Sequence, residues 1–426
     1  MRVLGTQTKP EFASPQILER IDSPEHILQN WAKDTWGSIE RMIDPETGLP
    51  ADILMKGQNG AFRRSWNTSL TDMATLVWSS VAALDLDIIG REKAQGIVGK
   101  LLRTYGKLEK FNSLPLNWYD RRTGENPKFW QSSGTKLKLP NIPFVSSIDL
   151  GWWLYSLVLI QKALPKFTEI SQRYIDELNL SPIYDANFNL FHGGILIDGS
   201  NYSPSQWYID VLNHEGRMLV YMAVMLGKIP KNALYALGRD KPSIGKARPD
   251  KKSFQEITLS YSGGGLEMFA PPIFIDEKVF LNEQTNGLIQ SPNHQAATKH
   301  LIEIGNKNCG GRFAWTPCLN PSNVYMEYGC HDLAMGAGYP SSNVEAIHGY
   351  YFTFPYAPNE SYRALERIHD HPGAFNSGLG FVSSIDDTRQ DQSVAPGILT
   401  VEQGFIMAQT NNILNKNKMR DYLSIL

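Results

Sequence analysis

Two helical segments joined by a tight connection, within residues 68–110, constrain the fold of this chain of 426 residues more than any other feature. From Thr68 onward, apolar side chains recur with the spacing of one helix face, at Leu70, Met73, Val77, Val81 and Leu84. Gly90 ends this segment, and residues 91–110 form a second helix that returns alongside the first. Two long helices with a short connection make an antiparallel hairpin, the unit from which helical toroids are built.

The rest of the chain continues this alternation of helical segments and long loops. Ser23 and Pro24 mark the start of the first helix, and Thr400 with Gln403 has the pattern of a capping box at the start of the last long one. Further helical patterns occupy residues 146–164, 166–180, 206–230, 292–305 and 358–369, with short helices from about 231 and about 416. The sequence predicts an all-α toroid of inner and outer helices with one small β-hairpin at 183–203. We expect an irregular arm at residues 1–22 and a single domain at 23–426.

Composition and motifs exclude several functional classes. The net charge is -2 and the pI is near 6.5, with no long basic run outside residues 246–252, which argues against nucleic acid as a partner. No segment is apolar enough to span a bilayer, and the first residues lack the apolar core of a signal peptide. The cysteines and histidines match no metal-binding pattern, and no nucleotide-binding or serine-hydrolase motif occurs. We therefore expect neither a metal nor a cofactor.

Glu215 is the first catalytic candidate because it interrupts an apolar stripe. In a helix over residues 206–230 it would share one face with Val211, Met218, Met222 and Met225. A carboxylate in such a place is either desolvated beside a partner, such as Arg217, or lines an internal cavity, and both environments shift its pKa.

Four other carboxylates occupy places where chemistry is plausible. Asp72, Asp149 and Glu402 fall in the first turn of an expected helix, where an acid also has the structural role of complementing the helix dipole. Glu267 follows three glycines, which allow close approach of the backbone. A structural and a catalytic interpretation remain open for each of them.

Aromatic residues gather in the loops rather than on helix stripes, which suggests a cleft lined for sugars. The relevant positions, with the adjacent Asp120, are Trp66, Trp118, Tyr119, Trp207, Tyr208, Trp315 and Tyr356. Flat rings with a polar edge stack on sugar rings, and paired carboxylates catalyse glycoside hydrolysis. The combination predicts a glycoside hydrolase.

Several sequence blocks resemble the glycoamylase-like domain of cyclic β-1,2-glucan synthases, which is similar to the endo-β-1,2-glucanases. These blocks are NWYDRRTGE (117–125), FVSSIDLGWW (144–153), LNHEGRMLVYMAVMLGKIP (212–230), YSGGGLEMFAPPIF (261–274), FPYAPNESYRAL (354–365), GLGFVSSID (378–386) and LTVEQGFIMAQTNN (399–412). They occur in the same order as in that family and span roughly residues 60–415. The resemblance implies an (α/α)6 toroid that acts on a β-linked glucan, with β-1,2-glucan as the best choice. We expect the protein to be a monomer. It also implies a periplasmic or secreted location, or a cytoplasmic one if the chain is full length.

Carried over residue by residue, the resemblance matches Glu215 and Arg217 to the family's acidic and basic pair. Asp72, Asp149, Glu267 and Glu402 match its other acids, and Glu402 stands where an aspartate is more usual. Where the family has an acid shortly after a tryptophan, this chain has WTPCLNPSN, without a carboxylate between Trp315 and Glu327.

We expect Glu215 to be the general acid and either Asp149 or Glu402 to be the base or nucleophile. Two alternatives remain, a polysaccharide lyase that uses Tyr208 and His214, and a glycan-binding protein without activity.

Overall fold

A computed structural model describes residues 23–423, except for 58, 128, 132–137, 141, 239–256, 278–290, 337 and 392. The expected arm at residues 1–22 lies outside the described residues. Within them, no helix combines the length and the apolar character needed to cross a membrane.

The first helices follow the sequence pattern closely. Helix α1 (Pro24–Met42) begins where expected, and the Ser23 side chain accepts a hydrogen bond from the backbone N–H of His26. Helices α2 (Leu70–Asp85) and α3 (Arg91–Tyr105) form the predicted hairpin. The other helices are α4 (Ser147–Ala163), α5 (Thr168–Glu177), α6 (Arg217–Met225), α7 (Asn232–Ala236), α8 (Gly265–Phe269), α9 (Pro271–Phe274), α10 (Ser291–Asn308), α11 (Ile347–Thr353), α12 (Pro358–His369), α13 (Thr400–Leu414) and α14 (Lys418–Asp421).

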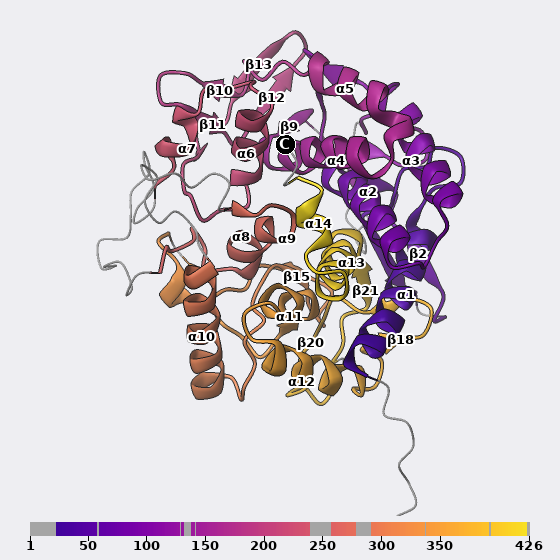
Figure 1. The fold of residues 1–426 in the computed structure, drawn as a ribbon, viewed down its shortest axis with the longest axis vertical. Coiled ribbons are helices and arrows are strands. Elements are labelled where there is room, and N and C mark those ends of the chain that lie inside the picture. Colours follow the sequence, from indigo (N-terminus) through magenta and orange to yellow (C-terminus); the bar gives the residue numbers. More distant parts are fainter. Residues whose placement is uncertain are drawn as a thin grey trace, which may run out of the picture.

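Helices that are buried on almost every side alternate along the chain with helices that bury one side. The buried set comprises α2, α4, α6, α8, α11 and α13, and the short helix α9 directly after α8 is buried as well. Around the centre of the molecule, α13 contacts α2, α2 contacts α4, α4 contacts α6, and α11 contacts both α8 and α13 (Figure 1). Helices α1, α3, α5 and α12 pack outside this set, against α13, α2, α4 and α11 respectively.

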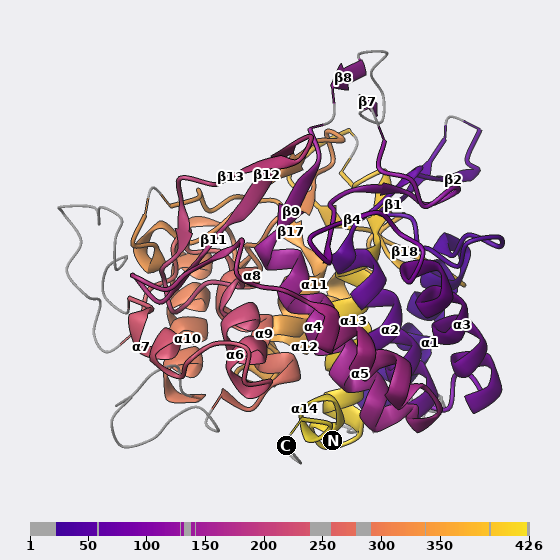
Figure 2. The ribbon, with the colours of Figure 1, turned by 90° about the horizontal axis from the view of Figure 1, so that it is seen from above.

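Small β-sheets gather at one end of the helices, where Figure 2 shows most of the strands. The three-stranded sheets have the orders β2-β1-β21, β10-β11-β14 and β13-β12-β9. Their strands are β1 (Ile53–Lys56), β2 (Phe62–Arg64), β9 (Phe144–Ser146), β10 (Tyr184–Asp185), β11 (Leu190–His192), β12 (Gly194–Asp198), β13 (Asn201–Pro204), β14 (Tyr208–Ile209) and β21 (Gly397–Leu399). The fold is mostly helical with several small sheets, so the sequence prediction of a single small hairpin underestimated the β-structure. Strands of two to five residues are too short to show a clear alternation in the sequence.

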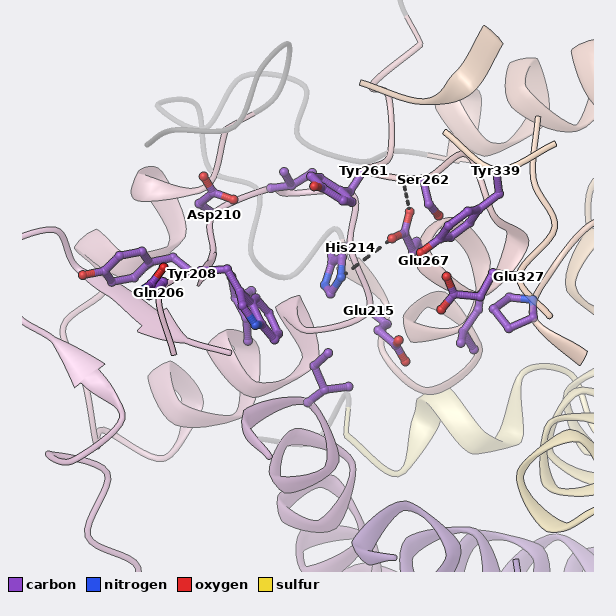
Figure 3. Close-up of a pocket in the computed structure, with 16 residues that line it drawn as sticks. Gln206, Tyr208, Asp210, His214, Glu215, Tyr261, Ser262, Glu267, Glu327 and Tyr339 are labelled. Carbon is purple, nitrogen blue, oxygen red and sulfur yellow. Dashed lines mark hydrogen bonds and ion pairs between the residues drawn. The ribbon is translucent and has the colours of Figure 1, made fainter. Parts of the chain in front are cut away.

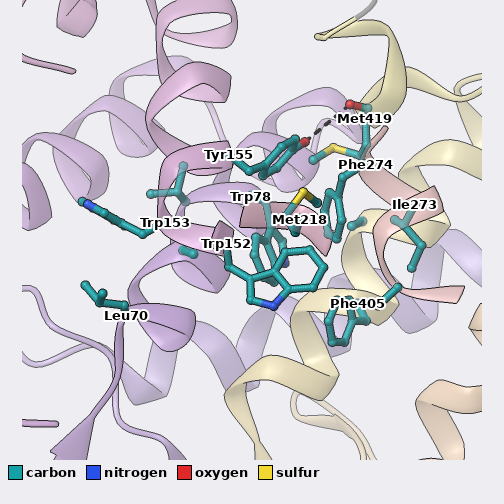
Figure 4. Packing of buried hydrophobic residues seen from close by; sticks show 14 of the residues in the cluster. Leu70, Trp78, Trp152, Trp153, Tyr155, Met218, Ile273, Phe274, Phe405 and Met419 are labelled. Atoms are coloured by element: carbon teal, nitrogen blue, oxygen red, sulfur yellow. Dashed lines mark hydrogen bonds between the residues drawn. The ribbon is translucent and has the colours of Figure 1, made fainter. Parts of the chain in front are cut away.

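Aromatic side chains fill the centre of the helical assembly (Figure 4). The ring centroids of Trp78 and Phe274 lie 4.8 Å apart, and Phe405 stacks on Trp78 at 5.7 Å. Gly151 allows α4 to approach α6 closely, because a Cβ at this position would lie 2.6 Å from the backbone nitrogen of Leu219. The core therefore depends on large rings from three helices and on one close backbone contact.

The predicted helix over residues 206–230 is wrong in its first half. Helix α6 begins at Arg217, and the preceding residues are held by partners distant in sequence. Ile209 pairs with Phe191, Val211 with Gly238, and Asn213 with Ser260. These bridges take up the backbone groups that a helix would have used.

The capping box predicted at Thr400 is also absent. The residue at the N-cap of α13 is Leu399, which makes no side-chain cap. The Thr400 hydroxyl donates to the carbonyl of Ala51 instead, and the Gln403 amide donates to the carbonyl of Phe381 at 3.1 Å. Both side chains tie α13 to neighbouring segments.

Candidate active site

A cavity of about 600 Å³ opens where helices α4, α6 and α8 begin. Acidic and aromatic side chains share its wall, as Figure 3 shows. The lining residues are Ile148, Gln206, Trp207, Tyr208, Ile209, Asp210, Val211, His214, Glu215, Tyr261, Ser262, Leu266, Glu267, Pro317, Glu327 and Tyr339. A partly apolar wall with a few converging polar groups is typical of a small-molecule or saccharide site.

Glu215 lies in the turn that leads into α6, and its carboxyl faces the cavity. Burial, followed by the charges of Glu267 and Asp149, raises the pKa of Glu215 to about 8. The position is therefore the end of a helix rather than the middle of one, but desolvation acts on the carboxyl as expected. At neutral pH this side chain holds a proton that it can donate.

Glu267 and His214 form the neighbouring part of the wall. The backbone N–H of Ser262 donates to Glu267 Oε2 at 2.8 Å, and His214 Nε2 lies 3.7 Å from Glu267 Oε1. Burial raises the pKa of Glu267 to about 7 and lowers that of His214 to about 4. His214 Nδ1 accepts the backbone N–H of Gly216 at 3.0 Å, so the neutral ring carries its proton on Nε2, toward Glu267.

Glu327 and Tyr339 line the cavity from the segment that follows α10, and they are hydrogen-bonded to each other. Burial and Glu327 raise the pKa of the Tyr339 hydroxyl. The charge of Glu327 also contributes to the raised pKa of Glu215. Three glutamates from distant parts of the chain thus act on one another electrostatically.

Asp149 lies in the first turn of α4, one residue after the lining residue Ile148. The Thr71 hydroxyl donates to Asp149 Oδ1 at 2.8 Å, and the Asn117 amide donates to Oδ2 at 3.3 Å. Both oxygens therefore act as acceptors, and the charge of Asp149 contributes to the raised pKa of Glu215. This arrangement suits a carboxylate of fixed orientation.

Glu402 and Asp72 lie deeper and are only 2% exposed. Burial raises the pKa of Glu402 to about 8, and the Ser383 hydroxyl donates to its Oε1 at 2.6 Å. Asp72 accepts the backbone N–H and the hydroxyl of Ser69 in the capping box of α2, and burial raises its pKa well above the usual range. A third buried acid, Asp52, has its pKa raised by burial to about 6. None of the three belongs to the cavity wall formed by the described residues.

Among the expected sugar-binding aromatics, Trp207 and Tyr208 line the cavity. The Trp207 ring rests on Gly193, where a Cβ would lie 2.0 Å from the ring, and half of the side chain remains exposed. The Tyr208 hydroxyl donates to Asp185 at 2.9 Å.

The other expected binding residues lie outside this wall. Tyr119 and Trp315 are buried, and donate to the carbonyls of Glu109 and Ser342. Tyr356 packs against Phe269 and His294. Trp66 and Trp118 are half-buried, and Asp120 binds Arg122.

Arg217 is fully buried, and its guanidinium is bonded to other groups of the protein interior. Its guanidinium donates to Glu277 at 2.6 Å and to the backbone carbonyls of His214, Glu267 and Met268. The ion pair expected with Glu215 is therefore replaced by one with Glu277. Arg217 joins the two segments that carry the cavity acids.

Several lining residues were not selected from the sequence, namely Gln206, Asp210, Tyr261, Ser262, Glu327 and Tyr339. Ser262 precedes the glycines that drew attention to Glu267, so the same signal could have included it. Tyr339 and Glu327 come from loops without a regular pattern, and only the fold brings them to the cavity. His214 had been selected only for the alternative lyase mechanism.

Comparison with known proteins supports the fold. The family model of a protein of unknown function, DUF3131, matches residues 30–198. An endo-β-1,2-glucanase from Chitinophaga pinensis, solved with sophorotriose and glucose, superposes with a TM-score of 0.71 at 13% identity over 94% of each chain. A protein from Bacteroides uniformis, provisionally assigned as a glucoamylase, gives a TM-score of 0.73 at 13% identity over 95% of each chain. A β-1,2-glucanase from Parabacteroides distasonis gives 0.69 at 14% identity over 94% of this chain and 58% of its own.

The chain shares the mostly helical fold of these glucoamylase-like toroids, which confirms the resemblance at the level of structure. Comparison of the sequence with curated proteins gives no match.

Proposed function

We propose that this protein is a glycoside hydrolase, or a transglycosylase of the same mechanism, that acts on a β-linked glucan, with β-1,2-glucan as the preferred substrate. The observation that carries the proposal is Glu215, a carboxyl with a pKa of about 8 on the wall of an acid-lined and aromatic cavity. A carboxyl that is still protonated at neutral pH can donate to the glycosidic oxygen as the bond breaks. The solved endo-β-1,2-glucanases of similar fold favour the linkage.

Asp149 is the better choice for the second carboxylate, the base or nucleophile. This role needs an ionised acid, whereas the pKa of Glu402 is raised to about 8 and Asp72 caps α2. Asp149 accepts hydrogen bonds at both oxygens and lies near Glu215. Glu327 is the competitor on the cavity wall, so Asp149→Asn and Glu327→Gln form the informative pair of variants.

The alternatives are less well supported by the site. A polysaccharide lyase with Tyr208 as its base needs that tyrosine to lose its proton easily, but burial and Asp185 raise the pKa of Tyr208. A binding protein without activity would have no need for a protonated glutamate on the cavity wall. We also propose that the helices form six inner and outer pairs, as in an (α/α)6 toroid, and that residues 23–426 act as one monomeric domain.

Incubation with a panel of β-1,2-, β-1,3-, β-1,4- and α-linked glucans, followed by product analysis, tests this function. We expect reducing ends to be released from the β-1,2-linked substrate. A product that absorbs in the ultraviolet through a new double bond would indicate the lyase instead. Glycan binding without any product would indicate the binding protein.

A further inference from the structure

A histidine, a cysteine and an aspartate meet outside the cavity. His300 comes from α10, and Cys330 and Asp332 come from the segment that contains the short 3-10 helix η3 (His331–Leu333). One ligand atom from each residue lies within 4.8 Å of the other two, and His300 Nε2 is 3.3 Å from Asp332 Oδ2. Among the described residues, this is the one such group that could hold a metal ion.

We propose that His300, Cys330 and Asp332 bind a divalent transition-metal cation, and that zinc is the preferred ion. Imidazole, thiolate and carboxylate are its usual ligands, at bond lengths that place two ligand atoms of a tetrahedron roughly 3.3 to 3.7 Å apart. The separation of His300 from Asp332 already has this value.

Charge and burial favour a cation at this place. Cys330 is 1% exposed and His300 is 9% exposed, whereas the Asp332 side chain is 47% exposed. A thiolate and a carboxylate together neutralise a divalent cation, so the buried site carries no net charge when it is occupied. The exposed side at Asp332 provides a route of entry, and a solvent molecule can occupy the fourth position.

The site would strengthen one wall of the cavity. The backbone N–H of Cys330 donates to the carbonyl of Gly263 at 2.9 Å, and Ser260 and Leu333 are joined by a hydrogen bond of 3.0 Å. The backbone N–H of Ser262, between these two contacts, donates to the carboxylate of Glu267. A metal that links α10 to residues 330–332 therefore holds the segment that orients Glu267, which makes its role structural.

Cobalt spectroscopy of the full chain tests the proposal directly. The protein, without a polyhistidine tag, is reduced, stripped with a chelator and titrated with Co²⁺. We expect a thiolate-to-cobalt charge-transfer band in the near ultraviolet at one equivalent, which one equivalent of Zn²⁺ abolishes. Zinc is also expected to raise the melting temperature of the stripped protein.

Variants assign the ligands. Cys330→Ser is expected to abolish the band. Asp332→Asn is expected to lower the affinity for Co²⁺ by more than about 100-fold, because loss of a residue that only supports a metal ligand already lowers affinity by roughly 10- to 100-fold. Cys309→Ser and Cys318→Ser are matched controls that should keep the band, because these buried cysteines lie outside the cluster. Asp332→Asn alters a partly exposed side chain without changing its shape, so it remains informative if Cys330→Ser does not fold. Absence of the band in the unmodified chain, or its persistence in folded Cys330→Ser, would overturn the proposal.

Discussion

The carboxyl of Glu215 is the residue on which the proposed chemistry depends. Replacing it with glutamine keeps the shape and removes the proton that is donated to the leaving oxygen. We expect turnover of Glu215→Gln to fall by at least about 100-fold while glycan binding is retained. Reducing-sugar release and calorimetric titration measure the two quantities. Glu169→Gln, at an exposed acid of α5, is the control, and full activity in Glu215→Gln would remove this residue from the mechanism.

The pH dependence of the reaction follows from the same side chain. Because the acid must be protonated and its pKa is about 8, kcat/KM is expected to fall about tenfold per pH unit above that value. The negative charge of Glu267 contributes to this raised pKa, so Glu267→Gln should move the decline to lower pH. A pH profile of both proteins measures the shift. An unchanged profile in a folded Glu267→Gln variant would contradict the coupling.

Two of the acids selected from the sequence, Glu215 and Glu267, lie on the cavity wall. Glu215 was found because a charge interrupts an apolar pattern, and Glu267 because three glycines precede it. The aromatic residues were predicted less well, since Tyr119 and Trp315 also come from loops but are buried by them. Exposure of a ring depends on what folds over it, and this information is distributed over the whole chain.

At the scale of elements, Arg217 holds the start of α6 against α8. Its guanidinium is paired with Glu277 and bonded to three carbonyls, all in the interior. Arg217→Gln leaves Glu277 without its ion-pair partner, so we expect a loss of about 3–5 kcal/mol in the free energy of unfolding.

Urea denaturation measures this loss. The matched control is Arg173→Gln, because Arg173 and Glu177 form an exposed pair on α5. Such pairs contribute at most about 1 kcal/mol. Equal losses in the two variants would show that the buried contacts of Arg217 contribute no more to stability than an exposed ion pair.

The close contact between α4 and α6 makes the stability of the fold sensitive to the size of residue 151. A methyl group at position 151 would meet the backbone of Leu219, so Gly151→Ala should destabilise the fold by about 1–3 kcal/mol. Gly96, also within a helix, has open space where a Cβ would lie. Gly96→Ala should therefore stabilise the protein by about 0.5–1 kcal/mol. Thermal and urea unfolding measure whether each variant is less or more stable than the unmodified protein. A Gly151→Ala variant that is more stable would refute the close contact.

The start of α6 shows what a periodic pattern cannot distinguish. Val211 and Met218 are both buried, as the stripe predicted, but only Met218 lies in the helix. Residues 206–216 are fixed by bridges to segments around 191, 238 and 260. Local spacing carries no information on such distant pairing, whereas α1 and α2 depend on local caps and were predicted closely.

For the whole molecule, the buried acids predict how stability depends on pH. Glu215, Glu267 and Glu402 have folded-state pKa values of about 8, 7 and 8, above their ordinary value. The folded chain therefore holds protons that the unfolded chain has released, and stability falls as pH rises toward 8. The buried histidines His214 and His348 have lowered pKa values of about 4 and 3. They make stability increase with pH, but only below about pH 6.5, where histidines of the unfolded chain take up protons.

We accordingly expect the melting temperature to fall between pH 6.5 and 8.5. Calorimetry across this range measures the fall, and Glu402→Gln should reduce its slope because the substituted side chain does not titrate. A melting temperature that rises over the same range would contradict the sign.

The ends of the described chain meet in the structure. Strand β21 pairs with β1, and α13 packs on both α1 and α2, where Phe405 stacks on Trp78. During synthesis, α1 and α2 are made long before α13, so the faces that α13 covers stay exposed until α13 has been made. A ribosome-bound chain that stops short of residue 400 thus presents an incomplete helical assembly in which Trp78 lacks its stacking partner Phe405. Such intermediates are prone to aggregation and chaperone binding.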